Sequence, residues 1–401
     1  MASLHKIPKF DPRLKSSARS SLELAAGWLA RTQVRDAWPC WNANKGRFIY
    51  HVRIDPKKRA AEPLTLSTCW KTSRACQGLY SAYAVTEKKS YLETAQLGCD
   101  YVCSLQFFEP GYEQFHGMFR EDSPQGPHLT LRDSMEACQA FINGYLACGS
   151  QRYLRRAILC ADWILKHYRH DSFPWNVAFP LADTDRKARY FFFYAGALVF
   201  AQLWAITRNQ AYVAKGLAPM ANYVLNNYLL DSGALGIKDA AASGAHHGAA
   251  TKYGHIVYND DGVGAAILAA YMVTGEGKYL DAATGMGDFW VNTRLEPQPL
   301  AAYPSIALFL ADLYRLTGQK RYLPVIEQFA RKTMQLQYLN KKDQLLYGGF
   351  IGEDMAEIYD KKSKPTDWVD LRITSYAMIL LGKLAARSDK QWNCAYSCFG
   401  W

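Results

Sequence analysis

The sequence predicts an all-α protein, an (α/α)6 barrel with two concentric rings of six helices each. Two observations predict it, a phrase that occurs five times and an alternation of apolar and amphipathic helices. In each phrase an aromatic residue near the end of an apolar run is followed eight positions later by a tyrosine. A constant offset of this kind indicates a repeated structural unit. The five pairs are Tyr83/Tyr91, Tyr145/Tyr153, Trp204/Tyr212, Tyr271/Tyr279 and Tyr314/Tyr322.

A short polar turn separates the two aromatic residues of each pair. The turns read TEKK, CGSQ, TRNQ, TGEG and TGQK, with residue types that end one helix and begin the next. Helices joined by such short turns must be antiparallel neighbours. We therefore expect five αα-hairpins, in each of which the second tyrosine packs back on the first aromatic residue.

The first predicted helix is the amphipathic stretch 16–33, which begins with serine. A long segment follows in which Phe48, Tyr50, Val52 and Ile54 alternate with other residues, and this predicts a short strand or ribbon. The remaining helices are predicted at 66–85, 88–107, 130–147, 150–168, 187–206, 209–228, 256–274, 277–293, 301–317, 320–337 and 368–386.

The first helix of each hairpin is apolar nearly all round, and the second is apolar on one side only. First helices are therefore expected inside and second helices outside. After residue 66 this gives six inner and five outer helices, and the helix at 16–33 supplies the sixth outer one. An open solenoid is the alternative, but it would expect polar capping repeats, and the last inner helix is apolar.

Composition favours one domain over residues 1–401, because 49% of the residues are apolar and no linker-like run divides the chain. Neither an apolar leader nor a run of about 20 apolar residues is present, so we expect a cytoplasmic protein without a membrane span. The ten cysteines lie mostly in apolar helices and are expected to be reduced. The sequence does not predict an oligomeric state.

The formal net charge of +11 is accompanied by 26 tyrosines and 11 tryptophans. No basic run or nucleic-acid motif is present, so nucleic acid is not expected as a partner. Basic charge and abundant aromatic residues fit a pocket for an anionic ligand that stacks on rings, and they equally fit an ordinary basic surface.

The repeated phrase resembles that of the α/α toroids, the superfamily of six-hairpin glycosidases, uronate epimerases, polysaccharide lyases and terpenoid cyclases. The resemblance runs over most of the chain through the pattern L-x-x-Y-x-x-T-G-x-x-x-Y-L. It implies the toroid fold and leaves the reaction open. The resemblance also implies catalytic carboxylates at the starts of inner helices, in several members as adjacent acids.

The long predicted connections, roughly 34–65, 108–129, 169–186, 229–255 and 338–367, all run from an outer to an inner helix. They therefore lie on the face where the inner helices begin, and long loops on a rigid scaffold are where binding groups collect. That face also presents helix N-termini, whose partial positive charge favours an anion. We expect the substrate site there, with short ribbons in the loops.

Adjacent acids at the predicted start of an inner helix, Asp260 and Asp261, are the first catalytic candidates. Gly262 and Gly264 follow them and would allow a ligand or a neighbouring helix to approach closely. Asp133, Asp260 and Asp367 also stand where N-caps are expected. The remaining catalytic candidates are Asp133, Glu136, His255 and Tyr190.

Glu136 lies a full turn inside an apolar helix and needs a partner, for which Arg132 is available four residues earlier. A histidine or tyrosine in a basic site can abstract a proton next to a carboxylate, and in the toroid lyases and epimerases such residues often do so. The predicted substrate-binding residues are Trp38, Trp41, Trp70, Arg74, Arg132, Arg189, Tyr194, Asn259, Tyr303, Arg372 and Tyr376.

No cofactor and no metal is expected. The glycines at 348, 349 and 352 do not have the spacing of a phosphate-binding loop, and they predict a tight turn or ribbon that places acids over the cavity. Whether a divalent metal binds near Glu353 and Asp354 stays open at this point.

The sequence therefore favours an enzyme that hydrolyses, eliminates or epimerises an anionic, uronic-acid-type saccharide or oligosaccharide by acid/base chemistry. A cyclase for isoprenoids or other natural products is the alternative, although a D-x-D-D motif is absent from the sequence. A helical scaffold that binds a partner without catalysis is the third possibility.

Overall fold

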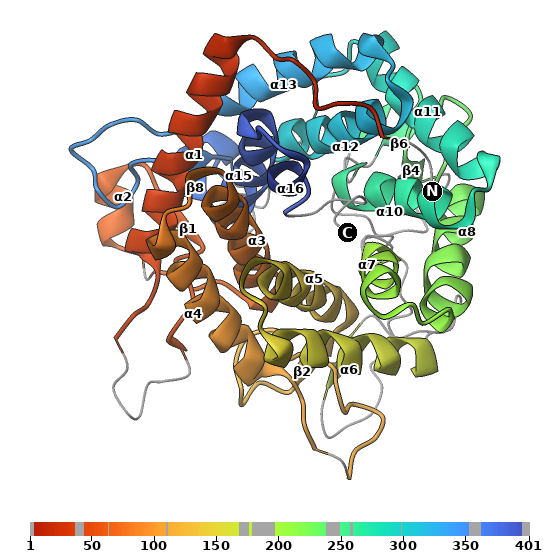
Figure 1. The fold of residues 1–401 in the computed structure, drawn as a ribbon. Helices are drawn as coiled ribbons and strands as arrows, with labels where there is room; N and C mark the ends of the chain where they lie inside the picture. The colour runs from red at the N-terminus through yellow and green to blue at the C-terminus, as the bar shows by residue number, and fades with distance from the viewer. Residues whose placement is uncertain are drawn as a thin grey trace.

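The structure, a computed structural model, describes residues 4–36, 44–62, 64–109, 111–167, 176–178, 197–237, 249–256, 260–297, 299–352 and 362–394. Within these ranges the helices form two concentric rings, and the all-α barrel that the sequence predicts is confirmed (Figure 1).

The inner ring is closed, because each inner helix contacts the next and the last contacts the first (Figure 1). Its members are apolar nearly all round, and most of their side chains are buried, as a helix enclosed by others requires. The inner helices are α3 (Cys69–Thr86), α5 (Leu131–Cys148), α7 (Ala197–Thr207), α10 (Asp260–Thr274), α12 (Ala302–Thr317) and α15 (Leu371–Ala385).

The outer ring is completed by the N-terminal helix α1 (Pro12–Thr32), which contacts α13, α15, α3 and α4. The prediction that this helix supplies the sixth outer member is confirmed, and the open solenoid is ruled out. The other outer helices are α4 (Lys89–Leu105), α6 (Gln151–His167), η3 (Tyr212–Leu217) with α8 (Ala218–Asn227), α11 (Gly277–Asn292), and η4 (Lys320–Tyr322) with α13 (Leu323–Gln335).

The start of α1 differs from the prediction at Ser16. The helix begins at Pro12, and the carboxylate of Asp11 accepts a hydrogen bond of 2.9 Å from the backbone N–H of Arg13. Aspartate before proline is a strong start signal, because the side chain caps a free N–H and proline has none to leave unpaired.

Three small sheets lie in the connections that lead from outer to inner helices, as predicted for the long loops. One joins the connection before α3 to the connection before α15, in the order β1 (His51–Arg53), β8 (Trp368–Asp370), β7 (Phe350–Ile351). The second pairs β2 (His128–Thr130) with β3 (Asn176–Ala178), and the third has the order β4 (Gly236–Ile237), β6 (Gly254–Ile256), β5 (Ala249–Thr251). All sheets are antiparallel, and they tie together the loops of one barrel face.

The connections on the opposite face are the short turns that the repeated phrase predicts. In each, the backbone N–H of the residue four positions after the first aromatic donates a hydrogen bond of 2.7 Å to the carbonyl of that aromatic. All five donors have positive φ, which closes the helix with a left-handed residue. Three are glycines, but Glu87 and Arg208 are not.

The second tyrosine of each phrase joins neighbouring outer helices. Its hydroxyl donates a hydrogen bond to a residue of the preceding outer helix. The pairs are Tyr91 with the Glu23 carbonyl, Tyr153 with Asp100, Tyr212 with Asp162, Tyr279 with Asn222, and Tyr322 with Asp288. In two hairpins the tyrosine ring also stacks on an aromatic residue one turn before the first member of the pair, Tyr153 on Phe141 and Tyr212 on Phe200.

The two left-handed positions that lack glycine give a first testable prediction. We expect Glu87→Gly to stabilise the protein by about 0.5–1 kcal/mol, because the positive φ of 60° costs a side-chain-bearing residue more than it costs glycine. Gly149→Ala is the matched test, since its φ is 71° and an added Cβ meets no atom within 4 Å. It should destabilise by about 1 kcal/mol. Urea unfolding measures both, and equal effects of the two changes would contradict the prediction.

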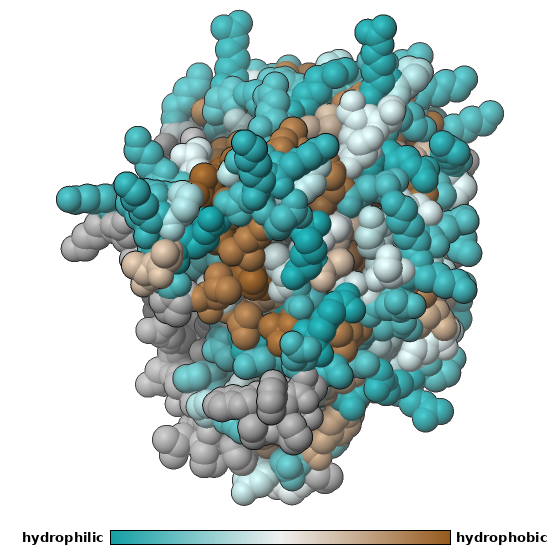
Figure 2. All heavy atoms as spheres, turned by 90° about the vertical axis from the view of Figure 1, so that its left-hand side faces the viewer, coloured by the Kyte–Doolittle hydropathy of each residue, from teal (hydrophilic) through white to brown (hydrophobic). Residues whose placement is uncertain are grey.

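The side of the molecule that carries α1, α2 (Pro56–Ala60) and α4 is mainly hydrophilic, with one apolar strip near its centre (Figure 2). The described cysteines are all free, and all but Cys148 and Cys394 are buried, in keeping with the reduced thiols that the sequence predicts. Across the described residues, no helix combines the length and the apolar character that a membrane crossing requires.

Candidate active site

The N-terminal ends of α15, α3 and α5 carry a connected set of polar side chains, here called the mouth cluster. Its members are Trp70, Lys71 and Arg74 of α3, Arg132, Asp133 and Glu136 of α5, Arg372 and Tyr376 of α15, Asp370 at the end of β8, and Glu121 of the loop before α5. The three helices are consecutive in the closed inner ring. Seven predicted site residues are thus brought together by ring closure.

Asp133 holds two helix ends together, although it is not the N-cap that the sequence predicts. The N-cap of α5 is Thr130, whose hydroxyl accepts from the Asp133 N–H. The Asp133 carboxylate instead accepts 2.9 Å from the backbone N–H of Trp70, in the first turn of α3. It is fully buried and also bonds Thr130 and Arg132. Both carboxylate oxygens of Asp133 are therefore hydrogen-bonded within the protein, where they hold the starts of α3 and α5 together.

The predicted cap Asp367 is also corrected. Asp370 caps α15, since its carboxylate accepts from the N–H groups of Arg372 and Ile373 at 2.7 and 3.1 Å. Asp367 lies in the short helix η5 (Pro365–Asp367) and accepts from the Lys364 N–H. The cap of α5 is a threonine three residues before the predicted acid, and the cap of α15 is an acid three residues after it, so residue type alone does not show where each helix begins.

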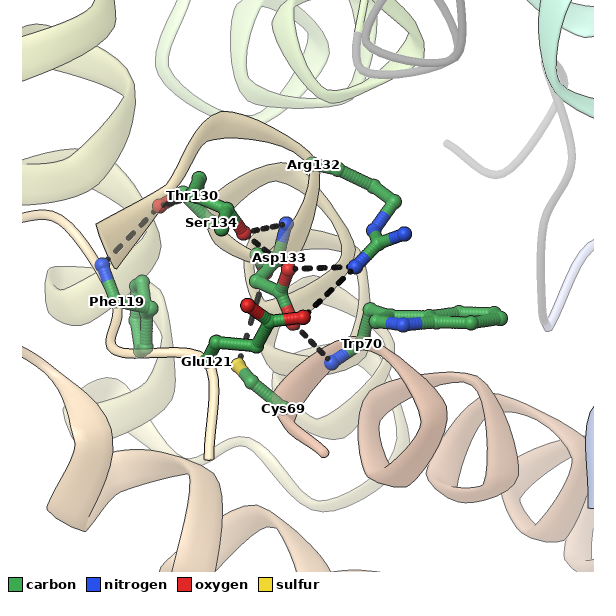
Figure 3. A network of polar contacts seen from close by, with 8 residues as sticks. All are labelled: Cys69, Trp70, Phe119, Glu121, Thr130, Arg132, Asp133 and Ser134. Atoms are coloured by element: carbon green, nitrogen blue, oxygen red, sulfur yellow. Dashed lines mark hydrogen bonds and ion pairs between the residues drawn. The ribbon is translucent and has the colours of Figure 1, made fainter. Parts of the chain in front are cut away.

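Trp70 organises the cations of the mouth cluster. The guanidinium of Arg132 lies 4.7 Å from the centre of the Trp70 ring, and the two side chains extend in the same direction from their helices (Figure 3). The guanidinium of Arg372 lies 5.9 Å from the same ring. Lys71 adds a third cation, 5.4 Å from Trp70 and 3.1 Å from the centre of the Tyr50 ring. An indole attracts cations to its face, so Trp70 holds several positive groups close together.

Arg74 links all three helices below this layer. Its guanidinium is ion-paired with Glu136 of α5 and lies 4.6 Å from the centre of the Tyr376 ring of α15. Gln77 adds a hydrogen bond of 3.2 Å to the same carboxylate. The proposed pairing of Glu136 with Arg132 is therefore wrong, because the side chain points sideways to α3 and not back along α5.

Glu121 is the loop residue of the mouth cluster, and it is not among the predicted site residues. Its carboxylate lies 3.4 Å from Arg132 (Figure 3). Its backbone carbonyl accepts a hydrogen bond of 2.7 Å from the N–H of Cys69, the first residue of α3. Burial raises the pKa of Glu121 to about 7, with a further increase from the charge of Asp133, while Arg132 opposes the shift. The adjacent acids Glu121 and Asp122 were the available signal, but they precede the predicted helix and were read as loop.

Tyr303 does not join this cluster. It lies at the start of α12, and its hydroxyl is hydrogen-bonded to Glu296, whose carboxylate also pairs with Lys332 of α13. Its ring contacts Phe329 edge to face. Burial and the nearby Glu296 raise its pKa above the ordinary tyrosine range. Tyr303 thus faces the outer ring, and its predicted role in substrate binding lacks support from this geometry.

The remaining candidates lie across the ring or outside the described residues. Asp260 and Asp261 are the first two residues of α10, as predicted, and His255 is in β6 with backbone partners Ile237 and Ala250. Candidates outside the described residues are Trp38, Trp41, Arg189, Tyr190, Tyr194, Asn259, Glu353 and Asp354.

The sequence left open whether Gly264 makes room for a ligand or for a neighbouring helix. A Cβ at this position would lie 2.3 Å from the ring of Phe309 in α12, so the glycine serves the close approach of a neighbouring helix. Among the described residues, no group of three or more His, Cys, Asp or Glu side chains is arranged to hold a metal ion.

Two of the cavities that described residues line lie away from the mouth cluster. The larger, about 690 Å³, is at the short-turn end and is lined by Tyr80, Tyr83, Leu146 and Lys390 among others. The smaller, about 380 Å³, lies beside α11 and includes Asp231 and Tyr253. Neither contains a predicted catalytic residue.

Part of the second half of the chain matches a known protein family. Residues 236–348 match the model of the beta-L-arabinofuranosidase GH127 catalytic domain. This segment runs from β4 to the turn before β7 and includes Asp260, Asp261 and His255. No curated protein sequence matches the chain.

Solved structures match over nearly the whole chain. Cellobiose 2-epimerase from Spirochaeta thermophila is 15% identical with a TM-score of 0.64, and the match covers 94% of this chain and 99% of that one. A family 76 mannosidase from Bacteroides thetaiotaomicron is 12% identical, with a TM-score of 0.63 and coverage of 93% and 98%. The fold is the six-hairpin α/α toroid. This confirms the architecture that the repeated phrase predicts.

Two further toroids show what this fold accommodates. An unsaturated glucuronyl hydrolase specific for heparin is 14% identical, with a TM-score of 0.64 and coverage of 92% and 97%. An alpha-1,6-mannanase of Salegentibacter sp. is 13% identical, with a TM-score of 0.61 and coverage of 92% and 98%. Its structure is that of an inactive variant in which two adjacent aspartates are alanine.

Proposed function

We propose that the protein is a carbohydrate-active enzyme that processes an anionic, uronic-acid-type saccharide at the mouth cluster. The observation that carries the proposal is the arrangement of Arg132, Arg372 and Lys71 around Trp70 at one end of a toroid. Guanidinium groups bind carboxylates with directed, charge-assisted hydrogen bonds. The net charge of +11 favours the same class of ligand.

The comparisons support a saccharide and do not favour the cyclase alternative. The epimerase, the mannosidase and the glucuronyl hydrolase share the toroid fold with this chain, and the matched family model is that of a glycosidase. Fold alone does not carry function, so the substrate class rests on the charges of the mouth cluster.

Acid/base groups are available from both sides of the inner ring. Asp260 and Asp261 remain candidate catalytic acids at the start of α10, and the mannanase with two aspartates replaced gives a precedent for such a pair. His255 and Tyr190 remain candidate bases for removing a proton next to a substrate carboxylate. Asp133 and Glu136 are better placed to position Trp70 and Arg74 than to meet a substrate.

A substrate panel tests the proposal. It contains an unsaturated glucuronyl disaccharide, a saturated uronate oligosaccharide, cellobiose, an alpha-1,6-mannan and an aryl beta-L-arabinofuranoside. We expect turnover of a uronate. New reducing ends indicate hydrolysis, a new ultraviolet absorbance indicates elimination, and deuterium uptake without cleavage indicates epimerisation. Turnover confined to the neutral arabinofuranoside would contradict the anionic substrate, and no turnover of any member would contradict the saccharide class.

The cation arrangement gives a second prediction. Arg372→Gln should raise KM for a uronate substrate by about 10- to 100-fold, because a charge-assisted hydrogen bond contributes roughly 1.5–3 kcal/mol. Added salt should weaken binding by the wild type more than by the variant. Arg321→Gln is the control, since it removes a guanidinium that is paired with Asp288 on the outer ring. Equal KM values for the two variants would contradict the assignment.

A further inference from the structure

We propose that Glu121 is the catalytic acid of the mouth cluster and that Asp133, which shares the Arg132 guanidinium with it, is its positioning residue. The inference rests on the proposed function in its hydrolytic form. It extends that function to a residue of the loop before α5, which neither the sequence pattern nor any comparison singles out.

Exposure separates Glu121 from the other described acids of the mouth cluster. Asp133 and Asp370 are fully buried, and their carboxylates accept backbone hydrogen bonds at helix starts. Glu136 is buried and ion-paired with Arg74. The Glu121 side chain retains 29% of its accessible surface. Among these four carboxyls it is therefore the one that a substrate can reach.

The surroundings of Glu121 suit a group that delivers a proton near neutral pH. The side chain is flanked by Asp133 and Arg132 of α5, Lys71 of α3 and its neighbour Asp122. Arg132 bonds both acids, at 3.4 Å to Glu121 and 3.1 Å to Asp133, and so holds two carboxyls around one cation (Figure 3). Burial of the Glu121 carboxyl, and after it the charge of Asp133, raises the Glu121 pKa to about 7.

Two backbone hydrogen bonds fix the position of Glu121. Its N–H donates 2.9 Å to the carbonyl of His128, at the start of β2, and its carbonyl accepts from Cys69. The loop is thus tied to α3 directly and to α5 through β2. A reacting group needs such support, because small displacements in a site reduce rates greatly.

In the proposed step Glu121 acts as a general acid. The proton of the Glu121 carboxyl passes to the bridging oxygen of the glycoside as the carbon–oxygen bond breaks, and the bond electrons stay with that oxygen. In hydrolysis, water then adds its oxygen to the sugar carbon, and one water proton returns to Glu121. Arg132 remains beside the carboxylate that forms and stabilises it until the proton returns.

The test compares Glu121→Gln with Asp122→Asn, which makes the same chemical change at the adjacent, exposed acid. We expect Glu121→Gln to reduce kcat/KM about 10²- to 10⁴-fold on a substrate with a poor leaving group. The loss should be much smaller on an activated aryl glycoside, whose leaving oxygen needs no proton. Asp122→Asn should retain activity on both. Equal losses on the two substrates, or an inactive Asp122→Asn, would overturn the assignment.

A measurement without substrate separates this inference from the proposed function. In protein labelled with 13C at glutamate carboxyls, one resonance should titrate near pH 7 and be absent from Glu121→Gln. Asp133→Asn should move that titration to lower pH, because it removes a neighbouring negative charge. A glutamate spectrum whose titrations all lie below pH 5.5, or an unmoved titration in Asp133→Asn, would overturn the roles even if a substrate is turned over.

Glu121→Gln should also change how the thermal stability of the protein depends on pH. Because the folded pKa is above the unfolded one, the contribution of Glu121 to stability decreases as pH rises from about 4.5 to about 7. The variant should therefore have a higher Tm than the wild type at pH 8, with a smaller margin at pH 5. A lower Tm at pH 8 would mean that the carboxylate is a structural ion-pair partner, and this would overturn the proposal.

Discussion

Arg74→Met will destabilise the protein by about 3–5 kcal/mol, because it leaves the buried Glu136 carboxylate without its cation. The Arg74 side chain is 2% exposed and that of Glu136 is 11% exposed, so water cannot replace the lost partner well. Gln77 retains one hydrogen bond to the carboxylate, which offsets only part of the cost.

The double variant Arg74→Met/Glu136→Gln provides the control. It removes both charges, and we expect it to recover most of the lost stability, because a buried ion pair can be replaced by neutral groups at little cost. Urea unfolding of the two single variants and the double variant gives the coupling energy. If the double variant were as unstable as the sum of the singles, the pair would not hold α3 and α5 together as described.

Lys383→Met should have a comparable effect at the opposite end of the ring. The Lys383 ammonium lies 3.0 Å from the carboxylate of Asp312 and donates 3.2 Å to the carbonyl of Trp392. The indole N–H of Trp392 donates 3.0 Å to the same carboxylate. Both charged side chains are at most 3% exposed. Methionine would leave the Asp312 charge with one neutral donor, and we expect a loss of about 3–5 kcal/mol.

This triad ties α15, α12 and the short helix α16 (Asp389–Trp392) together where the chain closes the ring. Lys278→Met is the matched control, because Lys278 and its partner Glu276 are about half exposed in a short turn. It should change stability by less than about 1 kcal/mol. Thermal unfolding compares the two, and a large effect of Lys278→Met with a small one of Lys383→Met would contradict the account.

The helices were predictable because two periodicities coincide in this sequence. Apolar residues recur with the helical period within each element, and the aromatic pair recurs at a fixed offset between elements. The place of α1 was predictable by counting, since five outer helices leave one position empty. Where the prediction erred, the decisive contact was between segments far apart in sequence. The strand at 368–370, predicted as helix, pairs with His51–Arg53.

The site was predictable as a location but not as a set of roles. Residues such as Trp70, Arg132 and Arg372 stand out because polar groups at the start of an apolar helix need an explanation. Their partners depend on which helices lie side by side, and for this reason Glu136 was assigned to Arg132 and not to Arg74. Glu121 was missed because its raised pKa arises from burial and, second, from the charge of Asp133, and no local pattern reveals either.

The left-handed turn residues show a similar limit. Glycine marks three of the five turns, but Glu87 and Arg208 take the same conformation at the other two. The turn is fixed there by the hydrogen bond to Tyr83 or Trp204 and by the packing of the two helices. Tertiary packing therefore outweighs a local preference of about 1 kcal/mol.

A crystal structure of the protein with a bound uronate oligosaccharide tests the central claim most directly. The account predicts the substrate carboxylate within hydrogen-bond distance of the Arg132 or Arg372 guanidinium and a glycosidic oxygen facing the Glu121 carboxyl. The same saccharide bound in the cavity of the short-turn end, against Tyr83 and Lys390, with the mouth cluster unoccupied, would contradict it.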